Sequence, residues 1–212
     1  MAQSNPILKN IRRSLGRLPG EPVPPSPPIL PPRLAADTTA EIDLLIKEIN
    51  LLSGVARRMD RAGLDAALQA LVQEQEVRKA TLWPTPLLAR LNLVERLRGL
   101  DVEIVPHNAG KLVMAQCDLG ITEVDFALPE TGTLALLSSP EKPRAVSLLP
   151  RVHLAVMPPS ALRADLHQVF AEACLANYMI FITGPSRTAD IELTTTLGVH
   201  GPRSLYLWVM DE

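Results

Sequence analysis

The segment VRKATLWPTPLLARLNLVERLRGLDVEIV, residues 77–105, contains the pattern from which the fold class follows. Its apolar residues predict a strand over 77–82, a helix over 87–97 that ends at Gly99, and a second strand over 102–105. Short strands that alternate with helices of about ten residues are typical of a parallel sheet with helices packed on it. The sequence therefore predicts an α/β fold with a layered sheet and flanking helices.

The same alternation extends from this segment in both directions. Upstream, Asp37 is expected to cap a helix that runs to about Leu52 and carries one apolar face. Further strands are predicted by apolar and β-branched runs at 54–56, 119–127, 133–138, 152–157, 178–183 and 205–209, and further helices at 61–74, 108–116 and 160–173.

The N-terminal part of the chain has a different composition. Residues 4–15 repeat apolar side chains every three to four positions, which predicts a short amphipathic helix within an N-terminal region 1–16. Eight of the fourteen residues from 19 to 32 are prolines, and each fixes φ and removes an amide donor. Residues 17–36 are therefore expected to be an extended, semi-rigid spacer, and residues 37–212 the α/β domain.

Charge and cysteine content argue against several classes of function. The net charge is −2 at pH 7, without the clustered excess of lysine and arginine that nucleic-acid binding requires. The two cysteines, Cys117 and Cys174, are too few for a disulfide framework or an iron–sulfur cluster within the chain. The four histidines lack zinc-ligand spacing, so no bound metal is predicted. No run reaches the roughly 18 apolar residues of a membrane span, and the first residues lack a signal-peptide core, so a cytoplasmic protein is expected.

The first segment with chemical potential follows the predicted strand 178–183. Ligands of open α/β sheets bind outside the carboxyl ends of strands, and Gly184 permits close backbone approach there. Ser186 and Thr188 offer hydroxyl groups, and the Arg187 fork suits a carboxylate or phosphate. A helical turn beginning near Thr188 would add unpaired amides for an anion.

Two carboxylates, Asp190 and Glu192, continue the same segment. Either carboxylate can hold the neighbouring arginine in place or act as a base. The alternative is an ordinary strand-to-helix turn with a cap and a surface ion pair. From the segment alone, both interpretations stay open.

A second candidate is the turn Glu130-Thr131-Gly132-Thr133 between two predicted strands. It places a carboxylate beside two hydroxyl groups. A hairpin turn with Gly132 at positive φ explains the glycine without any function, and for the isolated motif this is the simpler explanation.

Two histidines complete the candidates. His200 precedes a Gly-Pro turn and comes about ten residues after Asp190, so it can share a pocket with Arg187 and Asp190. His153 lies within a predicted strand among valines and leucines, where a histidine is more often a satisfied core or edge residue. The chain has no Walker P-loop, no G-x-G-x-x-G and no G-x-S-x-G motif.

Taken together and in this order, these segments resemble the LUD domain of the lactate utilization protein C family. The resemblance covers residues 37–210 and is most specific in the second half. It rests on ETGTL at 130–134, SLLPRVH at 147–153, ITGPSRTADIE at 182–192 and GVHGP at 198–202.

The resemblance implies a Rossmann-like α/β fold similar to the sugar-phosphate isomerase and CoA-transferase group. It also implies one component of a three-protein system that oxidises L-lactate to pyruvate, whose iron–sulfur clusters belong to the two partner proteins, with no cofactor bound by this chain. The expected ligand is a small carboxylate or a phosphate-bearing molecule. Residues expected to act in catalysis are Glu130, Asp190 and Glu192, and those expected to bind the ligand are Thr131, Gly132, Thr133, Gly184, Ser186, Arg187, Thr188 and His200.

Two other functions remain compatible with the sequence. The chain can be a non-catalytic assembly subunit that docks through its N-terminal amphipathic helix. It can also be a stand-alone enzyme of the CoA-transferase or isomerase kind, with Glu130 as nucleophile or base. The preferred interpretation is a subunit of an L-lactate-oxidising complex that is not a complete enzyme alone.

Overall fold

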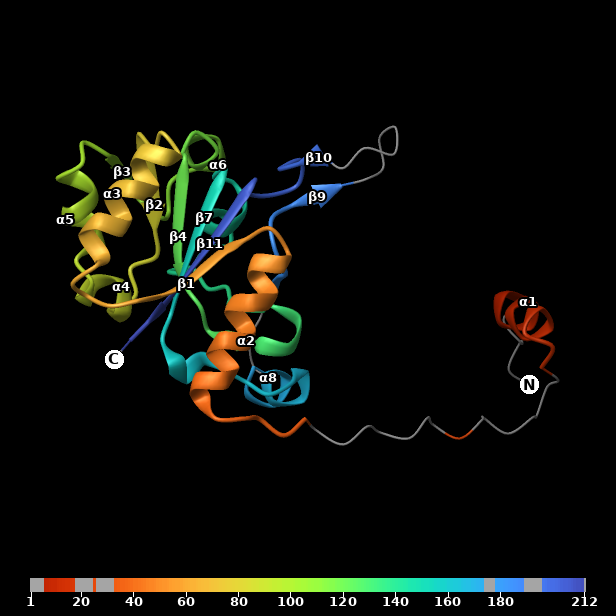
Figure 1. The fold of residues 1–212 in the computed structure, drawn as a ribbon. Coiled ribbons are helices and arrows are strands. Elements are labelled where there is room, and N and C mark those ends of the chain that lie inside the picture. The colour runs from red at the N-terminus through yellow and green to blue at the C-terminus, as the bar shows by residue number, and fades with distance from the viewer. Residues whose placement is uncertain (1–5, 18–24, 26–32, 174–177, 189–195, 212) are drawn as a thin grey trace. The chain divides into compact units, whose positions relative to one another are not determined.

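The computed structural model describes residues 6–17, 25, 33–173, 178–188 and 196–211. Internal contacts divide the chain into two units, Met1–Pro31 and Pro32–Glu212, and each is described by itself (Figure 1).

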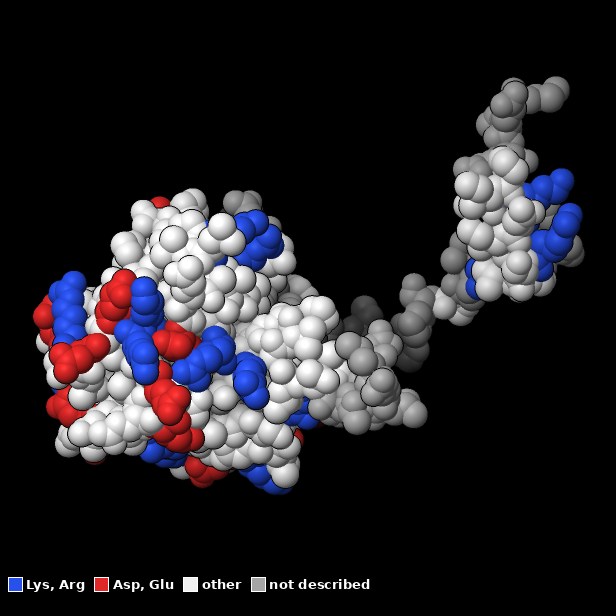
Figure 2. Space-filling model, turned by 90° about the horizontal axis from the view of Figure 1, so that it is seen from above, with Lys and Arg blue, Asp and Glu red and all other residues white. Residues whose placement is uncertain are grey.

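The N-terminal unit contains the helix α1 (Pro6–Ser14), which confirms the helix predicted over 4–15. Its apolar side chains Ile7, Leu8 and Ile11 are exposed, and its basic side chains gather along one side of the helix (Figure 2). Most of the proline-rich spacer predicted at 17–36 lies outside the described residues.

The larger unit is built on a six-stranded sheet in which every strand pair is parallel, with the order β1-β11-β7-β4-β2-β3. Helices flank the sheet (Figure 1), so the predicted α/β fold is confirmed. The strands are β1 (Val55–Met59), β2 (Lys79–Leu82), β3 (Glu103–Val105), β4 (Leu119–Glu123), β7 (Val152–Met157) and β11 (Ser204–Met210).

Burial follows from the apolar strand sequences. All six residues of β7 are buried, as expected of a central strand covered on both faces. The helix α2 (Thr38–Leu51) begins at the predicted cap, where the Asp37 carboxylate accepts hydrogen bonds from the N–H groups of Thr39 and Ala40. The other flanking helices are α3 (Leu64–Glu74), α4 (Pro86–Arg90), α5 (Leu93–Arg98), α6 (Lys111–Met114) and α7 (Ala145–Leu148).

The single helix predicted over 87–97 is wrong, because α4 and α5 are separate. Asn92 lies between them with a left-handed backbone (φ 52°). Asparagine is one of the few residues that adopt this conformation readily, so it ends one helix and redirects the chain into the next. The apolar spacing is the same on both sides of Asn92, which is why periodicity alone did not reveal the break.

A second layer contains a three-stranded antiparallel sheet with the order β5-β6-β8. The run 119–127, predicted as one strand, divides between β4 and β5 and so contributes to two different sheets. Asp125 lies at the division, and its carboxylate accepts a hydrogen bond from the Leu137 N–H. The layer comprises β5 (Phe126–Leu128), the 3-10 turn η1 (Pro129–Thr131), β6 (Thr133–Leu137), a second 3-10 turn η2 (Pro159–Ala161), α8 (Leu166–Glu172) and β8 (Met179–Ile182).

The strand β8 differs from expectation in its place and its burial. It pairs with β6 in the antiparallel layer, not with the parallel sheet, and Phe181 is 41% exposed. The next residues form β9 (Arg187–Thr188), paired antiparallel with β10 (Thr196–Leu197), so the helical turn expected near Thr188 does not begin there. The loop after β8 is therefore not at the carboxyl end of the parallel sheet.

Candidate functional site

The predicted segments 184–188 and 198–202 lie side by side around Ser186. The Ser186 N–H donates to the Pro202 carbonyl (2.9 Å), and the Ser186 carbonyl accepts from the Gly198 N–H (2.9 Å). The Ser186 hydroxyl accepts from the His200 N–H at 3.3 Å. The sequence predicted that these two segments share a pocket, and in the structure they lie in contact.

These segments form one side of a cavity of about 260 Å³, whose lining includes Ser147, His153, Ser186, Arg187, His200 and Leu205. His153 and Leu205 are the second residues of β7 and β11, so the cavity lies at the amino ends of these strands. In Figure 1, β9 and β10 are drawn at this end, opposite the end where the C-terminus lies. The site was expected at the carboxyl ends of the parallel strands, but this cavity lies at their amino ends.

Arg187 is the charged residue of this cavity. Its guanidinium donates a hydrogen bond to the carbonyl of Leu52, just after α2, which fixes the side chain. No aspartate or glutamate is among the described residues that line the cavity. An arginine with no carboxylate among the other described lining residues favours an anion as the occupant.

Gly184 makes the approach to α2 possible. It has φ +85°, and a Cβ at this position would lie 3.1 Å from the Leu52 carbonyl oxygen. A side chain would therefore push the loop away from the carbonyl that holds Arg187. The predicted need for glycine is explained by packing within the protein and by its backbone angle.

His153 is 1% exposed, and burial lowers its pKa to about 3, so the ring is neutral at pH 7. Its Nε2 lies 2.9 Å from the Thr122 hydroxyl. Its Nδ1 is buried and has no hydrogen-bond partner within the described part of the chain. The sequence favoured a satisfied core histidine, and the structure shows instead a core histidine that lines a cavity with one nitrogen unsatisfied.

Gly120 explains how α7 covers this histidine. It pairs with His153 across β4 and β7, and a Cβ on Gly120 would lie 1.9 Å from the Val146 carbonyl oxygen. Only glycine lets α7 approach so closely and bring Ser147 to the cavity. The sequence analysis missed Thr122, Gly120 and Ser147 as site residues, because their relation to His153 depends on strand register.

The second predicted motif, at Glu130, forms the turn between β5 and β6. Gly132 has φ +61° and packs on α2, where a Cβ would meet the Glu48 carbonyl carbon at 3.0 Å, so turn geometry explains this glycine. The Thr131 and Thr133 hydroxyls lie 2.8 Å apart, and Thr133 bonds the Thr183 hydroxyl at 2.8 Å. This chain of hydroxyl groups connects the turn to the end of β8.

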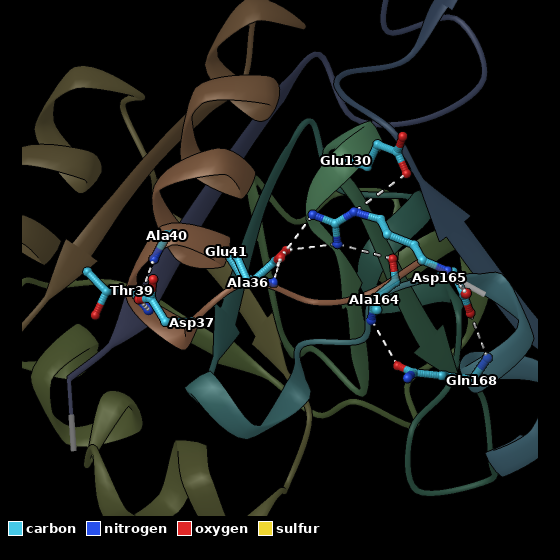
Figure 3. Close-up of polar contacts among 10 residues, drawn as sticks. Ala36, Asp37, Thr39, Ala40, Glu41, Glu130, Ala164, Asp165 and Gln168 are labelled. Atoms are coloured by element: carbon cyan, nitrogen blue, oxygen red, sulfur yellow. Dashed lines mark hydrogen bonds and ion pairs between the residues drawn. The ribbon is translucent and has the colours of Figure 1, made fainter. Parts of the chain in front are cut away.

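Glu130 itself forms an ion pair with Arg33, which was not among the predicted site residues; Figure 3 labels Glu130 and draws this ion pair as a dashed line. Its carboxylate lies 3.9 Å from the Arg33 Nε, and its side chain is 68% exposed. The Arg33 guanidinium donates to both carboxylate oxygens of Glu41, at 2.9 and 3.0 Å, and the Arg33 N–H donates to Asp165 at 2.9 Å. Arg33 thus connects the last part of the predicted spacer to α2, to the β5–β6 turn and to the start of α8.

The Arg33–Glu41 pair is partly withdrawn from solvent, with side chains 25% and 5% exposed. Burial alone raises the pKa of Glu41, but hydrogen bonds from the Arg33 guanidinium and the Ala36 N–H outweigh it, so this pKa lies below its ordinary value. Glu41 therefore remains ionised in the folded protein. The signal in the sequence was an arginine directly after a proline run and eight residues before a glutamate.

The predicted site residues thus separate into two places. Ser186, Arg187 and His200 line the cavity described above, whereas Glu130 and Thr131 line another of about 240 Å³ with Asp165 and His167. Thr188 lies in β9, beside the first cavity. The predicted residues Asp190 and Glu192 lie outside the described residues.

No group of three or more His, Cys, Asp or Glu side chains among the described residues is arranged to hold a metal ion. None of the helices described is both long and apolar enough to cross a bilayer.

The fold and the site define an α/β protein with a parallel central sheet, an antiparallel side layer and a small cavity between them. The family model of the LUD domain matches residues 45–210, and the chain therefore belongs to the LUD domain family. Its relatives include lactate utilization protein C of Halalkalibacterium halodurans, which is 36% identical over 73% of this chain and 71% of the relative. Lactate utilization protein C of Shouchella clausii is 32% identical over 74% of this chain and 72% of the relative.

A solved structure supports the fold. The crystal structure of a DUF162 family protein from Deinococcus radiodurans superposes with a TM-score of 0.63 at 17% identity. The match covers 84% of this chain and all of the other, and it shows a shared fold.

Proposed function

We propose that this protein takes part in lactate utilization, as one component of a cytoplasmic system that oxidises L-lactate to pyruvate together with two iron–sulfur proteins. Two relatives that this chain covers over more than two thirds of their length are named lactate utilization protein C, and these names support a role in lactate utilization. In this proposal the electron-carrying clusters belong to the partners, and this chain binds a small carboxylate.

The observation that carries the binding role is Arg187, an arginine fixed by a backbone carbonyl at a cavity whose described lining has no carboxylate. A charge-assisted bond from a guanidinium to a carboxylate is about twice as strong as a neutral hydrogen bond. Ser186 and His200 stand beside it and complete the polar side of the cavity.

Glu130 takes a supporting role in this proposal. Its position beside Arg33, at a different cavity, favours a contribution to the anchoring of the spacer. Asp190 and Glu192 keep the role that the sequence suggests for them, to hold Arg187 in place or to act as a base. This role rests on their position in the sequence, three and five residues after Arg187.

The test is the variant Arg187→Ala in the full chain, compared with Arg98→Ala, an exposed arginine on α5. Lactate-dependent reduction of an electron acceptor is measured in a system reconstituted with the two iron–sulfur proteins. Loss of activity with unchanged folding in Arg187→Ala alone supports the proposal. Full activity of Arg187→Ala would remove the binding role from this cavity.

A second function is favoured by α1, whose apolar side chains are exposed and whose basic side chains lie along one side (Figure 2). An amphipathic helix of this kind suits docking into a groove of a partner with an acidic surface. Deletion of residues 1–32 tests this role. Lost association with the iron–sulfur proteins, with retained ligand binding, assigns α1 to assembly, and retained association contradicts it.

A further inference from the structure

A further cavity lies at the carboxyl ends of two parallel strands, the place where the sequence predicted a ligand site. Its volume is about 430 Å³, and its lining includes Leu82 and Val105, the last residues of β2 and β3. The loop after β2 adds Trp83 and Thr85 to this β2–β3 cavity, and the loop after β3 adds His107. It shares no lining residue with the Arg187 cavity, so the two are separate.

The strand order explains why a cavity forms at this place. In the order β1-β11-β7-β4-β2-β3, the chain continues from β2 outward to β3, whereas the strand of this sheet that follows β4 is β7, on the other side. The connections after these two neighbouring strands therefore diverge, which is the arrangement that opens a crevice for ligands in α/β sheets. Trp83 lies at this point: it lines the cavity, and its N–H donates to the Ile121 carbonyl of β4 at 3.1 Å.

The lining favours a neutral and largely apolar occupant. No lysine, arginine, aspartate or glutamate is among the described residues that line the β2–β3 cavity, in contrast to the Arg187 cavity. A charged ligand would lose water there without gaining an oppositely charged partner. Leu82, Trp83, Leu88 and Leu93 are buried residues of the lining. A rigid aromatic compound suits them, because it gains apolar contact and loses little conformational freedom on binding.

Three polar residues of the lining can donate hydrogen bonds to such a compound. Thr85 Oγ1 accepts from the Leu88 N–H at 3.4 Å, which leaves its own proton to donate. Asn92 is exposed and its side chain does not cap α5, and His107 is half-buried. Neither the Asn92 amide nor the His107 ring bonds another described residue. Several N–H and O–H donors around one space favour oxygen acceptors on the ligand.

We propose that the β2–β3 cavity binds a neutral, fused-ring aromatic compound that carries ring carbonyl oxygens. The apolar lining contacts the rings, and Asn92 and His107 donate hydrogen bonds to the carbonyl oxygens. The volume lies within the range of about 300–1,000 Å³ that is usual for ligand pockets. This site is independent of the Arg187 cavity and does not rest on the proposed role in lactate utilization.

The experiment is an NMR titration of the full chain with three probes. Chromone is a neutral fused-ring ketone, naphthalene has fused rings without oxygen, and the 2-carboxylate of chromone adds a negative charge. The signals followed are the indole N–H groups of the two tryptophans, Trp83 and Trp208. Chromone and naphthalene should shift the Trp83 signal and leave that of Trp208 unchanged. The carboxylate should bind at least about tenfold more weakly than chromone, because the described lining has no cation.

Two substitutions separate polar recognition from apolar packing. Asn92→Gly removes the amide and keeps the left-handed backbone, which glycine adopts freely. His107→Phe removes the ring nitrogens and keeps a ring of similar size. Each variant should weaken chromone binding about five- to tenfold, the loss of about one hydrogen bond, without weakening naphthalene binding.

A third substitution blocks the cavity itself. Ala89→Trp places a large side chain at an exposed alanine of α4 in the lining and should abolish binding of both neutral probes. Ala66→Trp, at an exposed alanine of α3 outside this cavity, is the matched control and should bind both normally. Chromone binding retained in Ala89→Trp, or equal losses for chromone and naphthalene in the polar variants, overturns the proposal. An unchanged Trp83 signal with both neutral probes also overturns it and leaves the Arg187 site standing.

Discussion

The central strand β7 of the parallel sheet and the edge strand β8 of the antiparallel layer beside it differ in burial. Every residue of β7 is buried, whereas β8 has no buried residue and Phe181 is 41% exposed. Residues of both strands line the Arg187 cavity: His153 comes from β7, Phe181 comes from β8, and Arg187 comes from β9, which follows β8 along the chain. The parallel sheet thus contributes a neutral imidazole, and the segment after β8 contributes a charged guanidinium, which needs little desolvation near water.

The largest expected effect is a loss of unfolding free energy when the buried strand β7 is changed. Leu154, fully buried in β7, should cost about 3 kcal/mol of unfolding free energy when replaced by alanine. Phe181→Ala, in the half-exposed β8, should cost no more than about 1 kcal/mol. Urea unfolding of both variants measures the difference. Equal losses would show that β8 is as tightly packed as β7.

The next effect concerns Arg33, at the end of the predicted spacer, which connects α2 to the antiparallel layer. Arg33→Ala leaves the buried Glu41 carboxylate without its partner and should destabilise the protein by about 2 kcal/mol. Thermal and urea unfolding supply the measurement. The matched control is the double variant Arg33→Met with Glu41→Leu, which should recover most of the loss because no buried charge remains unpaired. A double variant as unstable as Arg33→Ala would assign the loss to packing, not to charge.

A smaller effect is a dependence of stability on pH that originates in the parallel sheet. The folded pKa of His153, about 3, lies below the ordinary value of about 6.5, so below pH 6.5 protons bind preferentially to the unfolded chain. Stability should therefore fall as pH decreases from 6.5, by at most about 1.4 kcal/mol per pH unit for this group. His153→Gln should flatten the curve between about pH 6.5 and 5, above the range near 4 where Glu41 begins to protonate in the unfolded chain. An unchanged slope in His153→Gln would show that the ring is not held neutral.

The smallest effect is expected at exposed charges on the helices of the parallel sheet. The Arg98–Glu95 pair on α5 has side chains about 60% exposed. Arg98→Ala should change the unfolding free energy by no more than about 0.5 kcal/mol. Chemical unfolding at low and high salt checks this value. A larger loss would mean that surface ion pairs, and not apolar burial, hold this region.

The sequence predicted the parallel sheet better than the antiparallel layer and the β9–β10 segments, which carry most of the candidate site. Alternating apolar runs identified β2 and β3, and Asp37 marked the start of α2, because these signals are local. The break at Asn92 and the division of 119–127 between two sheets depend on backbone angles and partners that periodicity does not encode.

The site was predicted in part for the same reason. Ser186, Arg187 and His200 were expected to share a pocket, and they line one cavity. Glu130 was expected with them, but it lines a different cavity and pairs with Arg33, nearly a hundred residues earlier in the chain. His153 became notable only when β4 register placed Thr122 beside one ring nitrogen and left the other unsatisfied. These are long-range relations that only the folded chain defines.

Amide and imidazole chemical-shift mapping of the full chain with added L-lactate and pyruvate tests the central claim most directly. We expect the largest changes at Ser186, Arg187 and His200 and at the His153 ring, with Glu130 unaffected. Changes confined to Glu130, Thr131 and His167, or no change at saturating ligand, would contradict the account.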